Sequence, residues 1–342
     1  EYLRHQKDYQ AYLKELSTAI DRKYGDYSQF WHDRNYVQFA DRVKATVVFT
    51  HGSQDWNVKP INVYQMFRAL PDSLEKHLFF HNGAHVYMNA WQSIDFRESM
   101  NALICQKLLG LNNGYTLPTV IWQNNQSEQT WEVLDNFGRD NGKNIQLGEA
   151  EASIANHYEE ETFAKYGKAY QSFKDDLFAD KANAITLDFE LDQDIQINGR
   201  VHLELKVKSS TNRGLISAQV LEMGDKKYLA PIPALKRMNL DNGRLFKEEA
   251  LRELPFKQEK YRVITKGHLN LQNRKNLLNI ENVSPNEWMT IGLDLQPTIY
   301  KLNKGDKLRL VLYTTDFEHT IRDNSDYELT VDLSQSQMTL PY

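Results

Sequence analysis

Two short segments carry an acid and a histidine in positions suited to catalysis. Asp55 follows the apolar run 45–50 across a glycine turn, and His85 follows the apolar run 76–81 across Asn82-Gly83. Each run has the length of a buried strand, and the carboxyl ends of parallel strands meet at one edge of a sheet. A histidine is a suitable general base near neutral pH, and a carboxylate holds its tautomer and stabilises its cation. The pattern therefore predicts an acid–base pair at a sheet edge.

The sequence contains no motif for the nucleophile that such a pair would activate. Acid before histidine is the α/β-hydrolase order, in which a Gly-x-Ser-x-Gly turn precedes the acid. That motif is absent from the 342 residues, and neither Ser53, on the loop of the acid itself, nor Cys105, after the histidine, fits the order. The chain also begins with Glu1 rather than Met. We expect the serine and the oxyanion-hole loop to lie upstream of Glu1, and this chain alone to be inactive.

Two other interpretations use the same residues. A Gly-x-x-Asp loop is often turn chemistry, because an aspartate side chain bonds its own backbone. His81, His85 and Asp55 could also form a two-histidine, one-carboxylate metal set. Histidines four residues apart meet on one face only in a helix, and Asn82-Gly83 disfavours a helix there. The chain order and the strand-end placement favour the acid–base pair, so we expect no metal and no cofactor.

The elements that would position the pair have an α/β rhythm. Between residues 41 and 113, apolar runs alternate with helical patterns, which is typical of a parallel sheet. One helical pattern begins near Pro60, and a second extends from Ser93, a candidate N-cap, to Gly110, a candidate C-terminal glycine. The expected inner face of the first helix contains Ile61, Tyr64 and Leu70.

The pattern changes in the second half of the chain. Apolar residues recur with period two at 185–191, 201–207, 308–312 and 329–333. Many short alternating strands are typical of an antiparallel sandwich or a jelly roll. Before them, an aromatic stripe with helical spacing is interpreted as packing rather than as a stacking surface for a ligand; it consists of Phe163, Tyr166, Tyr170, Phe173 and Leu177.

We therefore predict an α/β part followed by an all-β part. Residues 1–40 form the end of a helical or irregular insert. Residues 41–135 form the C-terminal part of an α/β-hydrolase catalytic domain, and 136–182 a connecting segment with a helix. Residues 183–342 form a jelly-roll β-sandwich, with the change of texture between 115 and 185.

Composition excludes several classes of protein. Lys plus Arg is 41 and Asp plus Glu is 46, so the net charge of −5 offers no general footprint for nucleic acid or an anionic membrane. No apolar run approaches the ~18–20 residues that cross a bilayer. One cysteine excludes an internal disulfide framework and a multi-cysteine zinc site. We expect neither nucleic acid nor a membrane as a partner.

Several segments together resemble one family of serine peptidases. The runs at 30–36, 50–60 and 82–85, with 264–274 and 300–306 further on, resemble the S15 family of bacterial Xaa-Pro dipeptidyl-peptidases, relatives of cocaine esterase and the α-amino-acid ester hydrolases. The resemblance extends from about residue 25 to the end of the chain. It implies an α/β-hydrolase domain followed by a jelly roll, in a cytoplasmic homodimer.

The resemblance also implies roles for individual residues. Asp55 would be the triad acid and His85 the general base, in an enzyme that releases N-terminal dipeptides with proline in the second position through an acyl-enzyme. Asn57 and Val58 follow the acid closely, so Asn57 could bond the substrate and Val58 could line a proline pocket. No metal or organic cofactor is needed.

Two other functions remain open at this point. The chain could belong to another acyl or ester hydrolase of the same superfamily, because the groups that would clamp a substrate amine are not visible here. The aromatic-rich β part could instead be a carbohydrate-binding module, which would need an exposed row of Trp or Tyr on one sheet face.

Overall fold

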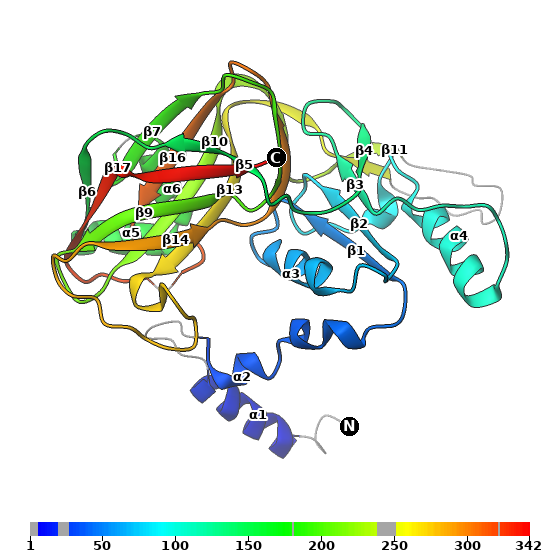
Figure 1. Cartoon of the computed structure of the whole chain (residues 1–342), viewed down its shortest axis with the longest axis horizontal. Coiled ribbons are helices and arrows are strands. Elements are labelled where there is room, and N and C mark those ends of the chain that lie inside the picture. The colour runs from blue at the N-terminus through cyan, green and yellow to red at the C-terminus, as the bar shows by residue number, and fades with distance from the viewer. Residues whose placement is uncertain (1–5, 20–26, 180, 238–250, 321) are drawn as a thin grey trace.

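A computed structural model describes residues 6–19, 27–179, 181–237, 251–320 and 322–342. Within residues 1–40 the structure describes 6–19 and 27–40, which are mostly helical, and the rest of the segment predicted as helical or irregular lies outside the described residues. No helix within these ranges is long and apolar enough to cross a membrane. The N-terminal helices lie at one end of the molecule in Figure 1: α1 (Gln6–Ala19), α2 (Gln29–His32) and the 3-10 helix η1 (Tyr36–Arg42).

A small four-stranded sheet follows these helices. Its order is β1-β2-β3-β4, in which β1 to β3 are parallel and β4 is antiparallel to β3. The two apolar runs of the sequence become β1 and β2, so this prediction is confirmed. One helix follows each of these two strands, as Figure 1 shows. The elements are β1 (Val47–Gly52), α3 (Ile61–Ala69), β2 (Lys76–His81), η2 (Met88–Ala90), α4 (Phe96–Leu109), β3 (Val120–Gln123) and β4 (Trp131–Leu134).

Both faces of this small sheet are covered. Leu78 and Phe80 of β2 point into one apolar cluster, while Phe79 between them points into another on the opposite face. A strand buried on both faces has no polar alternation, which explains the continuous apolar run at 76–81. Val63 and Phe67 of α3 join the first cluster, and Leu103 of α4 joins the second.

Two details of the predicted helices are corrected by the structure. On α3, Val63 and Phe67 are buried, whereas Ile61 and Tyr64 are only partly buried; Leu70 is buried as expected. The N-cap of α4 is Asp95, whose side chain accepts a hydrogen bond from the amide of Glu98, and not Ser93. Aspartate two residues nearer the helix makes the same bond that a serine would have made. Gly110 ends α4 in the left-handed conformation, as expected.

The rest of the chain is mostly β structure. One sheet has the order β13-β10-β16-β7, and a second has β14-β9-β17-β5 with β6 also on β17; all these pairs are antiparallel. The strands are β5 (Gly142–Gln146), β6 (Glu151–Asn156), β7 (Ile185–Glu190), β9 (His202–Ser209), β10 (Leu215–Leu229), β13 (Phe256–Asn270), β14 (Met289–Asp294), β16 (Lys307–Tyr313) and β17 (Tyr327–Pro341). Smaller elements are β8 (Ile195–Gly199) with β15 (Thr298–Leu302), β11 (Ala234–Arg237) with β12 (Leu251–Glu253), and η3 (Leu271–Asn273).

The largest apolar cluster of the chain lies between these two sheets. It takes every second residue from strands of both, including Leu203, Leu205 and Val207 of β9 with Ile216 and Val220 of β10. Period-two alternation arises because one face of each strand is buried and the other is not. The predicted β-rich second half, without a helical majority, is confirmed.

The segment 136–182 differs from the simple connection that we expected. It begins with β5 and β6, which pair with β17 and so belong to the second sheet. Two helices then replace the single predicted one, because the backbone leaves the helical conformation at Ala169, two residues after Gly167, a poor helix former. The helices are α5 (Glu160–Lys168) and α6 (Tyr170–Phe178). Most of the aromatic stripe packs in one cluster with Phe317, as interpreted, but Tyr170 is 43% exposed.

The small sheet and the two large sheets are in direct contact. Ile299 of β15 packs into one apolar cluster of the small sheet, and Leu229 of β10 packs into the other. The side-chain amide of Gln54 donates to the carbonyl of Val263 in β13 at 3.0 Å. The loop that carries Asp55 therefore lies at the junction between the two parts.

Candidate active site

The loops that carry the acid and the histidine leave the small sheet side by side. Strands β1 and β2 are parallel with Gly52 in register with His81, so both chains exit at the same edge. Two backbone hydrogen bonds continue the pairing beyond the strands. The amide of Ser53 donates to His81 at 2.8 Å, and that of Gln54 donates to Gly83 at 3.1 Å.

Gly52 is the point where the two loops approach most closely. A Cβ atom at this position would overlap the carbonyl oxygen of Gly83 and lie 2.5 Å from that of Ala84. The glycine therefore serves a close backbone approach rather than a left-handed turn.

The predicted contact between the acid and the histidine is confirmed. Nδ1 of His85 lies 2.7 Å from Oδ2 of Asp55, within the 2.6–3.2 Å expected for a hydrogen bond. The Asp55 side chain is 5% exposed, whereas that of His85 is 56% exposed. A buried carboxylate thus holds one ring nitrogen while the rest of the ring remains accessible.

The second carboxylate oxygen of Asp55 is held by its own loop. Oδ1 accepts hydrogen bonds from the amides of Asn57 at 3.2 Å and Val58 at 2.9 Å. Turn chemistry and a role beside the histidine are therefore compatible, because each uses a different oxygen. The side chains of Asn57 and Val58 are exposed and lie on the loop directly after the acid.

Two further histidines lie near the pair: His81, which the sequence suggested only for the alternative metal set, and His51, which it did not single out. Burial, with a smaller effect from the charge of His51, lowers the pKa of His81 to about 3. Burial likewise lowers the pKa of His51, although Asp55 opposes this shift. Both are therefore neutral near pH 7, which leaves the Asp55 carboxylate as the charged neighbour of His85. Their positions at the ends of β1 and β2 were the only signal in the sequence.

The alternative metal set is not assembled in the structure. Nδ1 of His81 accepts a hydrogen bond from the amide of Gly83 at 3.1 Å, and its ring packs on Trp91 with centroids 5.0 Å apart. Among the described residues, no three His, Cys, Asp or Glu side chains form a group that could hold a metal ion.

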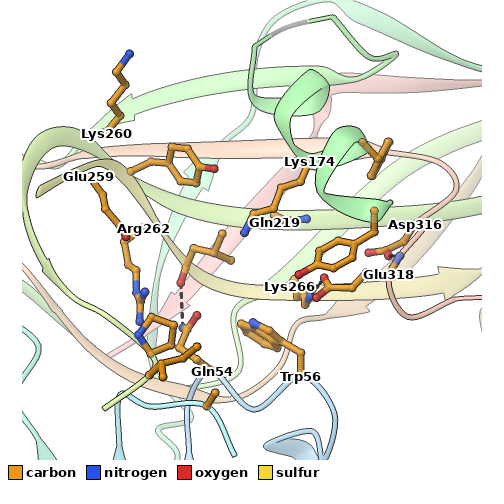
Figure 2. Close-up of a pocket in the computed structure, with 17 residues that line it drawn as sticks. Gln54, Trp56, Lys174, Gln219, Glu259, Lys260, Arg262, Lys266, Asp316 and Glu318 are labelled. Carbon is orange, nitrogen blue, oxygen red and sulfur yellow. Dashed lines mark hydrogen bonds and ion pairs between the residues drawn. The ribbon is translucent and has the colours of Figure 1, made fainter. Parts of the chain in front are cut away.

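Two cavities flank the loop of His85. One of about 210 Å³ is lined by His85 itself together with Tyr87, Trp91, Pro233 and Arg252. A larger cavity of about 530 Å³ lies toward the large sheets, where Trp56 and Ala84, the chain neighbours of the pair, form part of its wall (Figure 2). The site is therefore open on both sides of the histidine loop.

A second histidine–aspartate pair in the β part was missed by the sequence analysis. Nε2 of His268 lies 3.5 Å from Oδ2 of Asp316, and its Nδ1 lies 3.0 Å from the hydroxyl of Ser217. Burial lowers the pKa of His268 to about 4. These residues come from three elements far apart in the sequence, and only strand pairing brings them together.

Solved structures define the class of fold. An α-amino acid ester hydrolase has a TM-score of 0.65 and 12% identity over 98% of this chain and 62% of its own. A CocE/NonD family hydrolase from Staphylococcus aureus has a TM-score of 0.63 and 12% identity over 93% of this chain and 57% of its own. At this identity the likeness concerns the fold alone, which is that of these hydrolases.

Sequence comparison identifies the family. Residues 112–340 match the X-Pro dipeptidyl-peptidase C-terminal non-catalytic domain, and residues 1–87 match X-Pro dipeptidyl-peptidase (S15 family). The chain belongs to the X-Pro dipeptidyl-peptidase family.

Two relatives cover the whole chain. The Xaa-Pro dipeptidyl-peptidase of Streptococcus thermophilus (strain ATCC BAA-491 / LMD-9) is 94% identical over 342 residues, and that of Streptococcus pneumoniae (strain Hungary19A-6) is 60% identical over 343. In both comparisons the match covers 100% of this chain and 45% of the relative. The chain thus spans about half the length of these relatives.

Proposed function

We propose that this chain supplies the acid and the base of a Ser-Asp-His triad in a serine peptidase that releases Xaa-Pro dipeptides. The observation that carries the proposal is the 2.7 Å contact between buried Asp55 and exposed His85 at one sheet edge. Family membership and the names of the relatives support the choice of substrate, a peptide with proline in the second position.

In this mechanism His85 moves one proton twice. Its free Nε2 takes the proton of the serine hydroxyl while the serine oxygen attacks the carbonyl carbon that follows proline. The same nitrogen then gives that proton to the leaving amine, so the peptide bond breaks and a dipeptidyl ester of the serine remains. Water, activated by the same base, hydrolyses the ester. Asp55 holds Nδ1 protonated throughout and stabilises the imidazolium that forms twice.

Asn57 and Val58 are proposed to contact the substrate. Their backbone amides are used in holding Asp55, which leaves both exposed side chains available. The isopropyl group of Val58, 42% exposed, suits an apolar proline ring, and the amide of Asn57 suits a peptide carbonyl or amine.

The remaining parts of the proposal concern the larger protein. The chain holds no Gly-x-Ser-x-Gly motif, so we propose that it is inactive by itself and acts with a nucleophile supplied from outside it. No metal or organic cofactor takes part. We further propose a cytoplasmic homodimer, a jelly-roll topology for the two large sheets, and the division of the chain at residues 40 and 135.

The carbohydrate-binding alternative finds less support than the peptidase. It needs an exposed row of Trp or Tyr on a sheet face, and no exposed Trp or Tyr lies within the described strands of the two large sheets. Trp288 and Tyr342 are exposed just outside strand ends.

The test uses the full-length enzyme that contains this chain. We expect Asp55→Asn to lower kcat on Gly-Pro-p-nitroanilide by up to ~10⁴-fold, because the imidazole loses its correct tautomer while the geometry is kept. Asp72→Asn, at a fully exposed carboxylate, is the matched control and should be neutral. Circular dichroism should show an unchanged fold. Near-normal turnover by Asp55→Asn would reduce Asp55 to a turn residue.

A further inference from the structure

The larger cavity beside the active-site loops, which we call the junction pocket, has features of a binding site. It measures about 530 Å³ and is walled by Trp56 of the acid's loop, Tyr170 and Lys174 of α6, and Arg262 and Lys266 of β13. Cavities of a few hundred cubic ångströms with apolar walls and a few polar groups are typical of small-ligand sites. Figure 2 shows the side chains of Trp56, Lys174 and Lys266 reaching the pocket from the loop, the helix and the strand.

Arg262 is a buried cation of this pocket without a carboxylate partner. The residue is 7% exposed, and its guanidinium makes one long hydrogen bond, 3.4 Å to the carbonyl of Asn82. Within the described ranges, no carboxylate oxygen lies within ion-pair distance of it. Glu222 of β10 lies opposite Arg262 in the strand pairing, but its carboxylate is bound by Lys226 and by the hydroxyl of Tyr300 at 2.6 Å. Burying a guanidinium without a partner is costly, and an anionic ligand would offset the cost.

Lys174 is a second available cation. Its side chain is half-buried, and among the residues described it has neither a hydrogen bond nor an ion pair; burial lowers its pKa. Lys266, in contrast, is already used: it is paired with Glu318 and lies 4.6 Å from the ring centre of Trp56. Arg262 and Lys174 therefore remain free for a ligand, whereas Lys260, which also lines the pocket, points away from the other labelled residues in Figure 2.

The carboxylates that face the pocket do not form ion pairs with Arg262 or Lys174. Glu318 is bound by Lys266, and Asp316 accepts hydrogen bonds from the amides of its own turn and from the hydroxyl of Tyr313 at 3.0 Å. Glu259, which lies on β13, influences Arg262 and Lys174 only at longer range, without an ion pair to either. The ligand group that fits the guanidinium of Arg262 best is a carboxylate, because a guanidinium binds a carboxylate with two parallel hydrogen bonds.

The pocket adjoins the acid and the base. Trp56 follows Asp55 directly, and Ala84, also in the wall, precedes His85. Building on the proposed function, we propose that the junction pocket binds the free carboxylate end of short peptides on the leaving side of the scissile bond, with Arg262 and Lys174 as the anion partners. Aromatic rings of Trp56, Tyr170 and Tyr261 provide apolar surface for the side chains of those residues.

The experiment compares free-acid peptides with their C-terminal amides in the full-length enzyme. For Ala-Pro-Phe-Ala we expect the acid to exceed the amide in kcat/KM by about tenfold or more, the size of a charged hydrogen bond. Arg262→Gln should bring the ratio close to one and leave kcat/KM for Gly-Pro-p-nitroanilide, which has no such carboxylate, unchanged. Lys257→Gln, exposed on the same strand outside the pocket, is the matched control and should keep the wild-type ratio.

Stability provides an independent readout. A site residue that is desolvated without a partner should not support the fold, so Arg262→Gln should keep the wild-type Tm, whereas a structural arginine would lower it. If Arg262→Gln fails to fold, Lys174→Met replaces it, with a reduced acid-to-amide ratio as the expected result. The product Phe-Ala should inhibit competitively, and its amide should inhibit about tenfold less.

Several outcomes would overturn the inference while the proposed function stands. Wild type could treat acid and amide alike, or Arg262→Gln could keep the full preference. Acetate could also compete as well as Phe-Ala, which would make the pocket a simple anion site. Failure of the proposed function looks different: Gly-Pro-p-nitroanilide would not be cleaved, or Asp55→Asn would not impair its cleavage.

Discussion

The edge of the small sheet and the interior of the β part each hold a histidine beside an aspartate, and the two pairs are built alike. In both, Oδ1 of the aspartate accepts amide hydrogen bonds from residues two and three positions later: Asn57 and Val58 for Asp55, Glu318 and His319 for Asp316. In both, Oδ2 faces the imidazole.

The difference lies in what surrounds the ring. His268 is 18% exposed and has a partner at each nitrogen, Ser217 at one and Asp316 at the other. His85 is 56% exposed, and Asp55 is its one hydrogen-bond partner in the described structure. A ring enclosed by protein groups at both nitrogens has no nitrogen free to exchange a proton with a substrate, whereas a ring held at one nitrogen can do so at the other. Accessibility, and not the aspartate contact, separates a candidate base from a packing histidine.

Exchanging the two histidines for glutamine should separate activity from stability. In the full-length enzyme, we expect His85→Gln to reduce kcat by about 10⁴-fold or more, because the base is lost. Its exposed ring contributes little packing, so the urea midpoint should be nearly unchanged. His268→Gln should leave kcat intact and lower the free energy of unfolding by about 1–3 kcal/mol, since a buried hydrogen-bond partner is left unsatisfied. The reverse pattern would contradict the comparison.

Acid pH should lower the stability of both regions. Burial lowers the pKa of His268 to about 4 and that of His81 to about 3, each below its ordinary value of 6.5. The unfolded chain therefore binds more protons below about pH 6.5, and stability falls as pH falls from there to the folded pKa. Each histidine adds a slope of up to about 1.4 kcal/mol per pH unit.

Urea denaturation between pH 7 and 4 measures this slope. His268→Gln should remove the part that comes from the β region, so its curve should be flatter than that of wild type. A mutant curve parallel to wild type would show that His268 titrates normally in the folded protein.

Removing one partner of the His268 ring should have the smallest effect. Ser217→Ala deletes the hydroxyl that lies 3.0 Å from Nδ1 of His268 and also donates to the carbonyl of Thr314 at 2.8 Å. We expect a loss of about 1 kcal/mol in the free energy of unfolding. Turnover should not change, because freeing one nitrogen of a buried ring creates no base within reach of a substrate. A change in kcat with unchanged stability would mean that this cluster communicates with the active site.

Local signals in the sequence predicted the contact between Asp55 and His85 because it depends on local structure. Each member follows a short apolar run and a glycine turn, and the geometry of parallel strands brings the two loops together. The same reasoning placed β1, β2 and the period-two strands of the second half correctly. It also predicted the end of α4 at Gly110, since a left-handed glycine there is a local event.

What remained hidden depends on contacts between distant residues. Asp316 and His268 meet only because β10 pairs with both β13 and β16. β5 and β6 are recognisable as sheet members only through β17, at the far end of the chain. The aromatic residues on either side of Ala169 keep a helical spacing, so their pattern alone favours one continuous helix and does not reveal the break there. The unpaired charge of Arg262 has no signature in a sequence, because the absence of a partner is a property of the packed structure.

The closely approached glycine at the end of β1 has a consequence for protein engineering. Glycine-to-alanine replacement is a common route to thermostability, and candidates are usually chosen by excluding glycines with positive φ. Gly110 and Gly305 have positive φ but open space around them, whereas Gly52 has an ordinary φ and would pass that filter. A methyl group at Gly52 would push apart the backbones that carry Asp55 and His85. A screen guided by dihedral angles alone would therefore accept Gly52→Ala. That substitution would separate Asp55 from His85, the contact that an engineered enzyme has to keep.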